Sequence, residues 1–341
     1  MLTKRDATMA QGLAILGMVM LHLFCRLDSL PYNVHIYIGS VPVIYYIGLF
    51  GDLCVPVFCF CSGYAQYILS EKDINYNLNR YKRLRKFIIH FWIVLILFSF
   101  IGLLLESKDI PISISEFFGN LFLYRLSYNG AWWFVLSYIF LILLFPFMKK
   151  IIESVKPAIV MILAGCIYFV AYFFEILHPL SIENSLLEWI YTQLCLLGRT
   201  QLPFIIGSLC VKYQIIERIK DKIKSIKFKN LILIMVVLTM FIGHAIVQSM
   251  IVAPFTGLIT LLCFHLWEKP EVIQKIFYFL GKHSTNIWFT HMFFYMVLFK
   301  DLIFKLKEPI LIAGGMFLIC IIVSYSINII ESFLYKVMRI K

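Results

Sequence analysis

The sequence predicts an all-α, multi-pass membrane protein with about ten transmembrane helices and with both termini in the cytoplasm. Hydrophobic residues make up 61% of the 341 residues and charged residues only 15%, whereas a soluble domain is roughly 45–50% apolar and about 25% charged. The apolar residues fall into separate stretches of about twenty, which is the length that a helix needs to cross a bilayer. The lipid bilayer is therefore the first expected partner.

The predicted spans follow one another along the whole chain. The second span is long, and Gly51, Pro56 and Gly63 are expected to break or tilt it. The seventh and eighth spans are joined almost without a loop, at a turn marked by Pro254. In order, we expect spans at about 9–27, 42–69, 87–105, 131–148, 157–177, 192–211, 230–249, 251–267, 277–299 and 309–333.

The distribution of basic residues predicts the orientation of these spans. Most of the 31 Lys and Arg residues lie near the two termini or in the loops 70–86, 149–156, 212–229 and 268–282. Because cytoplasmic loops are enriched in Lys and Arg, this pattern places these loops and both termini inside. Topology thus accounts for the net charge of +12, and we expect no nucleic-acid partner.

The start of the chain shows no cleavable signal peptide, and the first span is expected to remain as an anchor. We expect residues 1–341 to form a single integral-membrane domain with no appended extracytoplasmic domain. The nine cysteines have no paired CxxC spacing, so neither a metal site nor a disulfide framework is predicted.

His22 lies inside the first predicted span and is the leading candidate for a functional residue. An ionisable side chain at membrane depth is costly and usually marks a site. Imidazole titrates near neutral pH, which suits it to taking a proton from a hydroxyl. Gln11 lies eleven residues earlier, on the same helical face and about 16 Å away. The alternative interpretation is a histidine that is satisfied by a neighbouring helix.

A second stretch of interest is GDLCVPVFCFCSGY, residues 51–64. It holds a carboxylate, Asp52, and ends in Ser62, Gly63 and Tyr64. Gly63 permits close approach of another backbone, and Ser62 can donate a hydrogen bond. The alternative interpretation is a corner where helices pack.

The segment NRYKRLRK, residues 79–86, precedes the third span on its cytoplasmic side. Arg80 and Arg83 are three residues apart and share a helical face, and Arg85 follows. Guanidinium groups suit the geometry of phosphates. The alternative is an ordinary positive-inside signal or a contact with anionic lipid.

Aromatic and polar groups mark two later spans. Trp132 and Trp133 lie at an outer boundary, where they indicate an interfacial belt, a surface that stacks on a sugar or the wall of a tunnel. His291 lies inside the ninth span with Asn286 nearby, and it is either part of a site or a satisfied interhelical donor. Carboxylates at depth are few, which does not favour the ion relay of a transporter.

Taken together and in order, six segments resemble the membrane-bound acyltransferase family 3, which contains bacterial O-acyltransferases of surface polysaccharides, lipopolysaccharide and peptidoglycan. The resemblance covers nearly the whole chain. The segments that carry it are QGLAILGMVMLH (11–22), VFCFCSGY (57–64), RYKR (80–83), WWFVLSYIFLILLFP (132–146), FIIGSLCVKY (204–213) and STNIWFTH (284–291).

The resemblance implies transfer of an acyl group, most simply acetyl, from acyl-CoA to a hydroxyl of a cell-envelope polysaccharide or lipid-linked sugar. The enzyme would lie in the bacterial plasma membrane, with acetyl-CoA as donor substrate and no bound cofactor. His22 would act as general base or as acyl relay. Ser62 or Tyr64 would stabilise the developing oxyanion.

The donor's phosphates would meet Arg80, Arg83 and Arg85, with Gln11 along the route to His22. Gln11 departs from the family pattern, which has a basic residue at this position. Glutamine donates a hydrogen bond but supplies no charge, so either another cation replaces it or the chain is a degenerate, non-catalytic membrane subunit. A transporter or flippase of a lipid-linked sugar or small acid is the remaining alternative.

Overall fold

The computed structural model describes residues 2–107, 110 and 113–337. Most of these residues are helical, and a single short hairpin provides the strands among them. The α-helices are α1 (Lys4–Phe24), α2 (Val43–Phe50), α3 (Cys54–Lys72), α4 (Tyr76–Leu104), α5 (Ile114–Leu121), α6 (Trp133–Ser154), α7 (Pro157–Tyr172), α8 (Ser185–Lys212), α9 (Ile215–Ile223), α10 (Lys229–Val247), α11 (Ala253–Leu266), α12 (Glu271–Met292), α13 (Lys300–Phe304) and α14 (Pro309–Val337).

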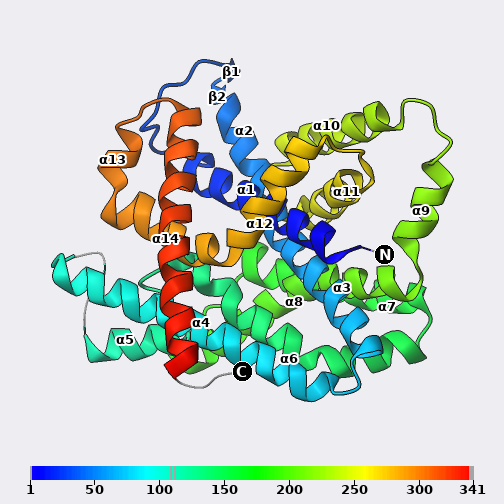
Figure 1. The fold of residues 1–341 in the computed structure, drawn as a ribbon, viewed down its shortest axis with the longest axis horizontal. Helices are drawn as coiled ribbons and strands as arrows, with labels where there is room; N and C mark the ends of the chain where they lie inside the picture. Colours follow the sequence, from blue (N-terminus) through cyan, green and yellow to red (C-terminus); the bar gives the residue numbers. More distant parts are fainter. Residues whose placement is uncertain (1, 108–109, 111–112, 338–341) are drawn as a thin grey trace.

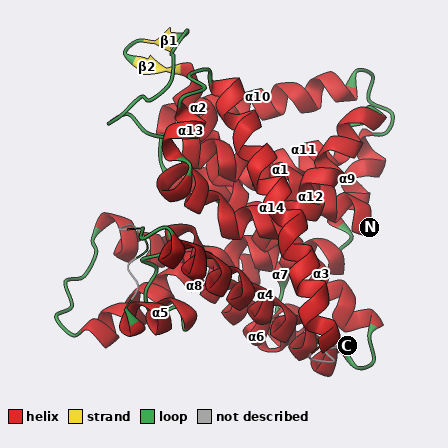
Figure 2. Cartoon of the chain, turned by 60° about the vertical axis from the view of Figure 1, so that its left-hand side comes forward, coloured by secondary structure: helices red, strands yellow, loops and turns green. Residues whose placement is uncertain are grey.

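Five tighter or wider helical turns and one hairpin complete the described chain. The 3₁₀ turns are η1 (Gly51–Leu53), η2 (Gly130–Trp132) and η4 (Met250–Val252), and the π-helical turns are η3 (Phe173–Leu177) and η5 (Phe293–Leu298). The strands β1 (Tyr37–Ile38) and β2 (Val41–Pro42) pair antiparallel, with Tyr37 opposite Pro42. Figure 2 shows this hairpin projecting beyond α2 at one end of the molecule.

The described residues contain eight helices that are long and apolar enough to cross a membrane. The protein is therefore an all-α, multi-pass membrane protein, as predicted, although fewer helices qualify than the ten expected. The predicted span 251–267 forms a shorter apolar helix, Met250–Leu266. The predicted span 277–299 falls within α12 and η5, where Lys275 and Lys282 interrupt the apolar sequence.

The predicted break in the second span is confirmed at Gly51. The helix α2 ends at Phe50, η1 forms a 3₁₀ turn, and α3 continues from Cys54. Pro56 lies in the first turn of α3, where its missing N–H costs no helical hydrogen bond. A 3₁₀ stretch inside a longer helix often marks a functional position.

Close packing of α1 against α12 depends on two glycines (Figure 1). A Cβ atom on Gly12 would meet the backbone carbonyl of Phe277, and a Cβ on Gly281 would meet that of Thr8. Small residues let helix backbones approach in membrane proteins, where packing rather than hydrophobicity drives association. The same α1–α12 contact brings the first predicted motif against the last.

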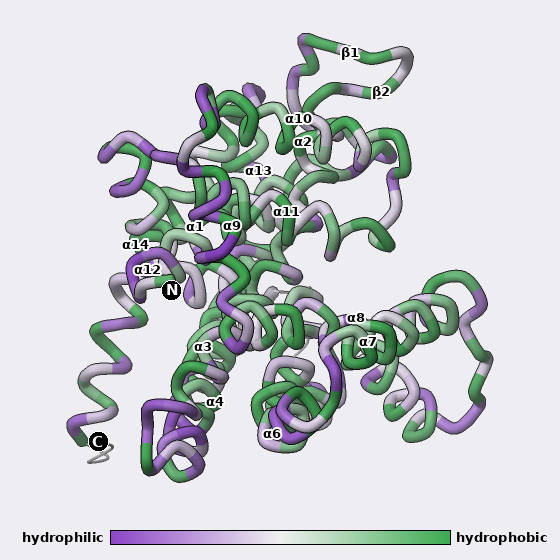
Figure 3. The backbone as a smooth tube through the Cα atoms, turned by 90° about the vertical axis from the view of Figure 1, so that its right-hand side faces the viewer, coloured by the Kyte–Doolittle hydropathy of each residue, from purple (hydrophilic) through white to green (hydrophobic). Residues whose placement is uncertain are grey.

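The helices α3 and α8 pack in the same way. Gly63 lies against the carbonyl of Phe204, and Gly207 lies against that of Phe60. The prediction that Gly63 permits close backbone approach is therefore confirmed. In its most apolar window α8 is 72% buried, whereas α10 is 11% buried, which places α8 inside the bundle and α10 on its lipid-facing side. Hydrophilic residues gather around α9 and the loop between α3 and α4 (Figure 3).

Candidate active site

His22 lies in the last turn of α1, next to His291 of α12. The two imidazole ring centroids are 4.9 Å apart. Nδ1 of His291 donates to the carbonyl oxygens of Ile287 at 3.1 Å and Trp288 at 2.9 Å, because a carbonyl can only accept. His291 is fully buried, and its Nε2 has no hydrogen-bond partner among the described residues. This nitrogen therefore carries a free lone pair beside His22.

The π-helical turn η5 begins two residues after His291 and completes the surroundings of the histidine pair. Tyr295 of η5 packs against both rings, with centroids 6.4 Å from His22 and 6.2 Å from His291. Arg26 lies 5.7 Å from the centre of the Tyr295 ring and donates from Nη2 to the His22 carbonyl at 3.2 Å. Single π-helical turns are frequent at functional sites.

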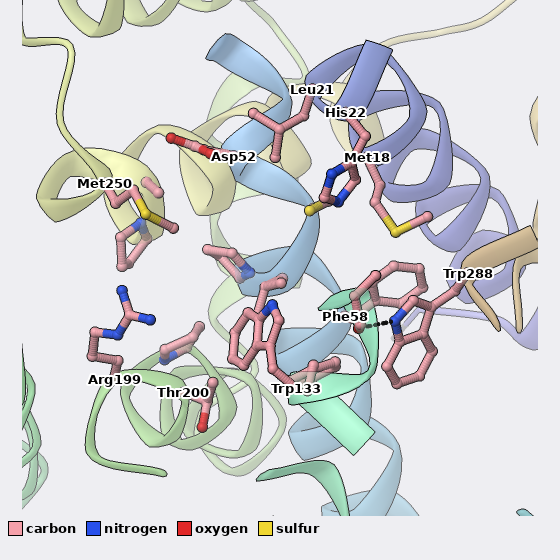
Figure 4. A pocket seen from close by; sticks show the side chains of 18 of the residues that line it. Met18, Leu21, His22, Asp52, Phe58, Trp133, Arg199, Thr200, Met250 and Trp288 are labelled. Carbon is pink, nitrogen blue, oxygen red and sulfur yellow. Dashed lines mark hydrogen bonds between the residues drawn. The ribbon is translucent and has the colours of Figure 1, made fainter. Parts of the chain in front are cut away.

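A cavity of about 950 Å³, counting its open part, lies in front of His22. Figure 4 shows His22, Asp52, Trp133 and Arg199 around this space. Its remaining wall is largely apolar, and Trp288 closes one side while its Nε1 donates to the Ala131 carbonyl at 2.9 Å. A mostly apolar cavity with a few convergent polar groups is typical of a small-molecule site.

Two ion pairs support the polar groups of the cavity. Arg199 Nε lies 2.6 Å from Glu175 Oε2 of the π-helical turn η3, and its guanidinium lies 5.9 Å from the centre of the Trp133 ring. Asp52 of η1 lies 3.5 Å from Nε2 of the buried His244 of α10. Charged groups at membrane depth need such partners, so both pairs keep a charge at the cavity wall.

The structure separates the two predicted tryptophans. Trp133 is half-buried and lines the cavity, whereas Trp132 is fully buried and donates from Nε1 to the Phe289 carbonyl at 3.1 Å. Trp132 also packs edge-on against Phe91. Trp132 therefore belongs to the core between α4, α6 and α12, away from any interfacial belt.

Ser62, Tyr64 and Asn286 lie outside the cavity lining. Ser62 donates to the Phe58 carbonyl at 2.8 Å. Tyr64 accepts from the Leu2 amide through its hydroxyl at 2.8 Å, at the opposite end of α1 and roughly 27 Å of helix away from His22. Asn286 donates to Ser324 of α14 at 2.8 Å. Each of these groups therefore already has a hydrogen-bond partner in the protein.

Arg80 is 4% exposed and contacts the backbone of α6 next to Pro146. Pro146 lies inside α6 and has no N–H, which leaves the carbonyl of residue 142 without its helical partner. Arg80 Nη1 donates to the carbonyl oxygens of Ile142 at 3.3 Å and Leu143 at 3.4 Å. These contacts give Arg80 a role in holding α4 against the bend in α6.

Arg83 and Arg85 have different surroundings. Arg83 Nη1 lies 3.7 Å from the Asp73 carboxylate, while its Nε and Nη2 are buried without a hydrogen-bond partner among the described residues. Arg85 is exposed. Arg80 also leaves one buried donor, Nε, without a partner in the described part of the chain. Of the three predicted donor-binding arginines, Arg83 has two such donors, and these would suit an anion.

A series of aromatic rings extends from Arg83 to the cavity. Phe87, one helical turn after Arg83, has its ring centroid 4.7 Å from that of Tyr138. Tyr138 is 6.3 Å from Phe134, which is 5.4 Å from Trp288. Phe134 and Trp288 both line the cavity. Gln11 lies half-buried on α1, and no hydrogen bond joins its side chain to the described residues.

Five residues of the site were not predicted as site residues, namely Arg26, Glu175, Arg199, His244 and Tyr295. Arg199 and His244 are ionisable residues inside predicted apolar spans, the same signal that selected His22. Asp52 was noted as a carboxylate at depth, but its partner could not be identified from the sequence.

The fold and the histidine cavity define a multi-pass membrane protein with a partly open cavity near one end of its first helix. A family model described as an acyltransferase domain, that of acyltransferase family 3, matches residues 7–329. The chain therefore belongs to acyltransferase family 3, as the six segments predicted. No match is found among curated proteins or among solved structures.

Proposed function

We propose that this acyltransferase moves an acyl group, most simply acetyl, from cytoplasmic acyl-CoA to a hydroxyl of a cell-envelope polysaccharide or lipid-linked sugar. Its proposed location is the bacterial plasma membrane, with both termini in the cytoplasm. The observation that carries the proposal is His22 in the cavity wall, beside the free Nε2 of His291. A general base must lie within hydrogen-bond distance of the proton that it removes. An imidazole in the cavity wall can come this close to the hydroxyl of a compound that is bound in the cavity.

In the proposed reaction His22 takes the proton of the acceptor hydroxyl. The acceptor oxygen attacks the thioester carbonyl carbon and forms the new C–O bond. The C–S bond then breaks, and the departing thiolate takes the proton from His22, which gives the ester and free CoA. The Arg199 guanidinium is the cavity cation that we assign to the developing oxyanion, in place of Ser62 and Tyr64.

His291 acts as a positioning residue in this scheme. Both of its contacts through Nδ1 are to backbone carbonyls, so the tautomer with a free Nε2 is fixed. A lone pair beside His22 favours one orientation of the His22 ring and stabilises its protonated form. The buried location of His291 keeps water from competing for this nitrogen.

We assign the donor's anionic end to Arg83, on the predicted cytoplasmic side. Its buried Nε and Nη2 are free to donate, and phosphates suit a guanidinium fork. The aromatic series from Phe87 to Trp288 connects this position with the cavity. The pantetheine arm would follow these rings and present the thioester near His22.

Gln11 is the residue that raised the alternative of a non-catalytic subunit. In our proposal the protein transfers acyl groups with Gln11 unchanged, because Arg83 supplies the positive charge. A degenerate chain transfers none, even after Gln11→Arg.

The proposal is tested by the acetate-ester content of envelope glycans in otherwise identical cells with and without the gene. Cells that express the protein should contain additional glycan-bound acetate that mild base releases. Equal ester content, despite protein in the membrane, would contradict the proposal.

A further inference from the structure

Asp52 is a carboxylate in the cavity wall that has no role in the proposed reaction. It lies in the 3₁₀ turn η1 and is 7% exposed. A carboxylate at membrane depth is costly and is usually retained for function. Its placement therefore calls for an explanation in addition to packing.

His244 is the side chain that lies against the Asp52 carboxylate. Its Nε2 lies 3.5 Å from Asp52 Oδ2, within reach of an ion pair but longer than a good hydrogen bond. Its Nδ1 lies 3.4 Å from Thr256 Oγ1, which itself donates to the backbone of α11. His244 is 1% exposed, and its two ring nitrogens face Asp52 and Thr256.

The oxygens of Asp52 retain capacity for a ligand. An ionised carboxylate offers about four acceptor positions and no donor. Among the described residues, no hydrogen bond reaches these oxygens, and His244 provides one contact at 3.5 Å. Asp52 is one of the residues that line the cavity (Figure 4), so a ligand in the cavity that donates a hydrogen bond can bind there.

Asp52 and His22 are positioned by the same helix contact. Gly51 packs against Gly17 and Leu21 of α1, because a Cβ on Gly51 would meet the Gly17 carbonyl and the Leu21 side chain. Asp52 directly follows Gly51, and His22 directly follows Leu21. The contact between Gly51 and α1 therefore positions both side chains, and both line the same cavity.

We propose that Asp52 binds a second hydroxyl of the acceptor, next to the hydroxyl that His22 deprotonates. The inference rests on the proposed acyl transfer and narrows its acceptor to a polyhydroxylated compound that presents two hydroxyls to this wall. A carboxylate accepts hydrogen bonds from hydroxyls and repels an anionic group at the same position. His244 serves as the positioning residue that holds the carboxylate in place.

The test separates acceptor use from donor use in membrane vesicles that contain the full-length protein. Transfer of labelled acetyl from acetyl-CoA is measured while the amount of a crude envelope-glycan preparation is varied, and then while acetyl-CoA is varied. The variants are Asp52→Asn, Asp52→Glu and His244→Gln. Asp301→Asn, which makes the same carboxylate-to-amide change at an exposed residue of α13 outside the cavity lining, is the matched control.

Asp52→Asn should raise the half-saturating amount of glycan roughly 10- to 100-fold, the effect of a hydrogen bond to a charged group. Half-saturation by acetyl-CoA should stay within about twofold. Asp52→Glu and His244→Gln should show smaller increases, and Asp301→Asn none. Asp52→Glu keeps the carboxylate but moves it by one methylene group. If Asp52→Asn does not fold, Asp52→Glu is compared with wild type instead.

Unchanged glycan dependence in Asp52→Asn or Asp52→Glu would overturn this inference alone, as would equal changes toward glycan and donor. A wild-type protein that transfers no label would instead overturn the proposed acyl transfer, and this inference with it.

Discussion

His291 can be distinguished from other buried histidines by what its two nitrogens contact. Nδ1 is bound to two carbonyls, and Nε2 is left free beside His22. His283, on the same helix, instead contacts Ser324 of α14 through Nδ1 at 2.8 Å. The pair of histidines on α12 therefore offers a matched comparison of a site residue with a packing residue.

We expect His291→Gln to lower the rate of acetyl transfer roughly tenfold, a loss of about 1.4 kcal/mol of transition-state stabilisation. Glutamine provides an acceptor oxygen but does not reproduce the fixed lone pair. Half-saturation by acetyl-CoA should change little, and His283→Gln should retain the wild-type rate. Wild-type kinetics in His291→Gln would show that this histidine serves only in helix packing.

The three arginines before the third span should respond differently to alanine. Arg83→Ala should weaken the use of acetyl-CoA roughly 10- to 100-fold, since it removes charge-assisted hydrogen bonds to the donor. Arg80→Ala should chiefly lower the stability of the protein in detergent, by about 1.5–3 kcal/mol, because it frees the carbonyls near Pro146. Exposed Arg85→Ala is the control for both effects.

Donor titrations and thermal unfolding measure these effects separately. Equal donor use by wild type and Arg83→Ala would contradict the assignment of the donor's phosphates to Arg83. An unchanged unfolding temperature in Arg80→Ala would contradict the role of Arg80 at the Pro146 bend.

At the scale of single residues, the sequence identifies polar side chains at membrane depth but does not tell which residues surround each of them. His22, His291 and Trp133 meet at the cavity as the motifs suggested, because ionisable or amphipathic residues at depth carry a strong signal. Ser62 and Asn286 carry a similar signal, yet they contact the backbone of their own helix or the polar groups of α14. Periodicity defines a face and does not tell which helix lies against it.

At the scale of elements, glycines decide how closely the helices approach. Gly281→Ala should destabilise the protein by roughly 1–3 kcal/mol, since its Cβ would meet the backbone carbonyl of Thr8 and one helix would have to shift. Gly314→Ala in α14 is the matched control, because no atom lies within 4 Å of the added Cβ.

Thermal unfolding in one detergent measures both glycine variants. Gly314→Ala should be neutral or slightly stabilising, as expected for alanine in a helix. Equal unfolding temperatures of Gly281→Ala and wild type would contradict the close α1–α12 contact that places His22 beside His291.

The irregular turns are the elements that the sequence did not reveal in full. The break at Gly51 was predictable from glycine and proline, whereas the π-helical turns η3 and η5 contain neither residue and are apolar apart from Glu175 in η3. A π-helical turn changes the hydrogen-bond register without changing hydropathy. Since η3 supplies Glu175 and η5 supplies Tyr295, a part of the site could not be found from periodicity.

For the whole molecule, hydropathy identified the class and overestimated the number of qualifying spans. The segment 250–266 is apolar but short, and α12 combines apolar residues with lysines and the site histidine. A helix that is enclosed by others and lines a site does not need an apolar sequence throughout. Composition alone therefore could not separate such a helix from a lipid-facing one.

The orientation of the molecule remains a prediction from its basic loops. Reporters fused to the N-terminus and to the C-terminus should both give a cytoplasmic signal, whereas a reporter inserted after Ile38 in the β1–β2 hairpin should give an external one. An external signal at either terminus would contradict access of cytoplasmic acyl-CoA to Arg83.

The central claim is that His22 transfers an acyl group supplied from the cytoplasmic side. Inverted membrane vesicles with radiolabelled acetyl-CoA test it most directly, with wild type compared with His22→Ala at equal amounts of folded protein. We predict label in vesicle glycan or lipid with wild type and a loss of at least about 100-fold in His22→Ala, as expected for removal of a general base. Equal labelling by the two proteins, or none by wild type, would contradict the account.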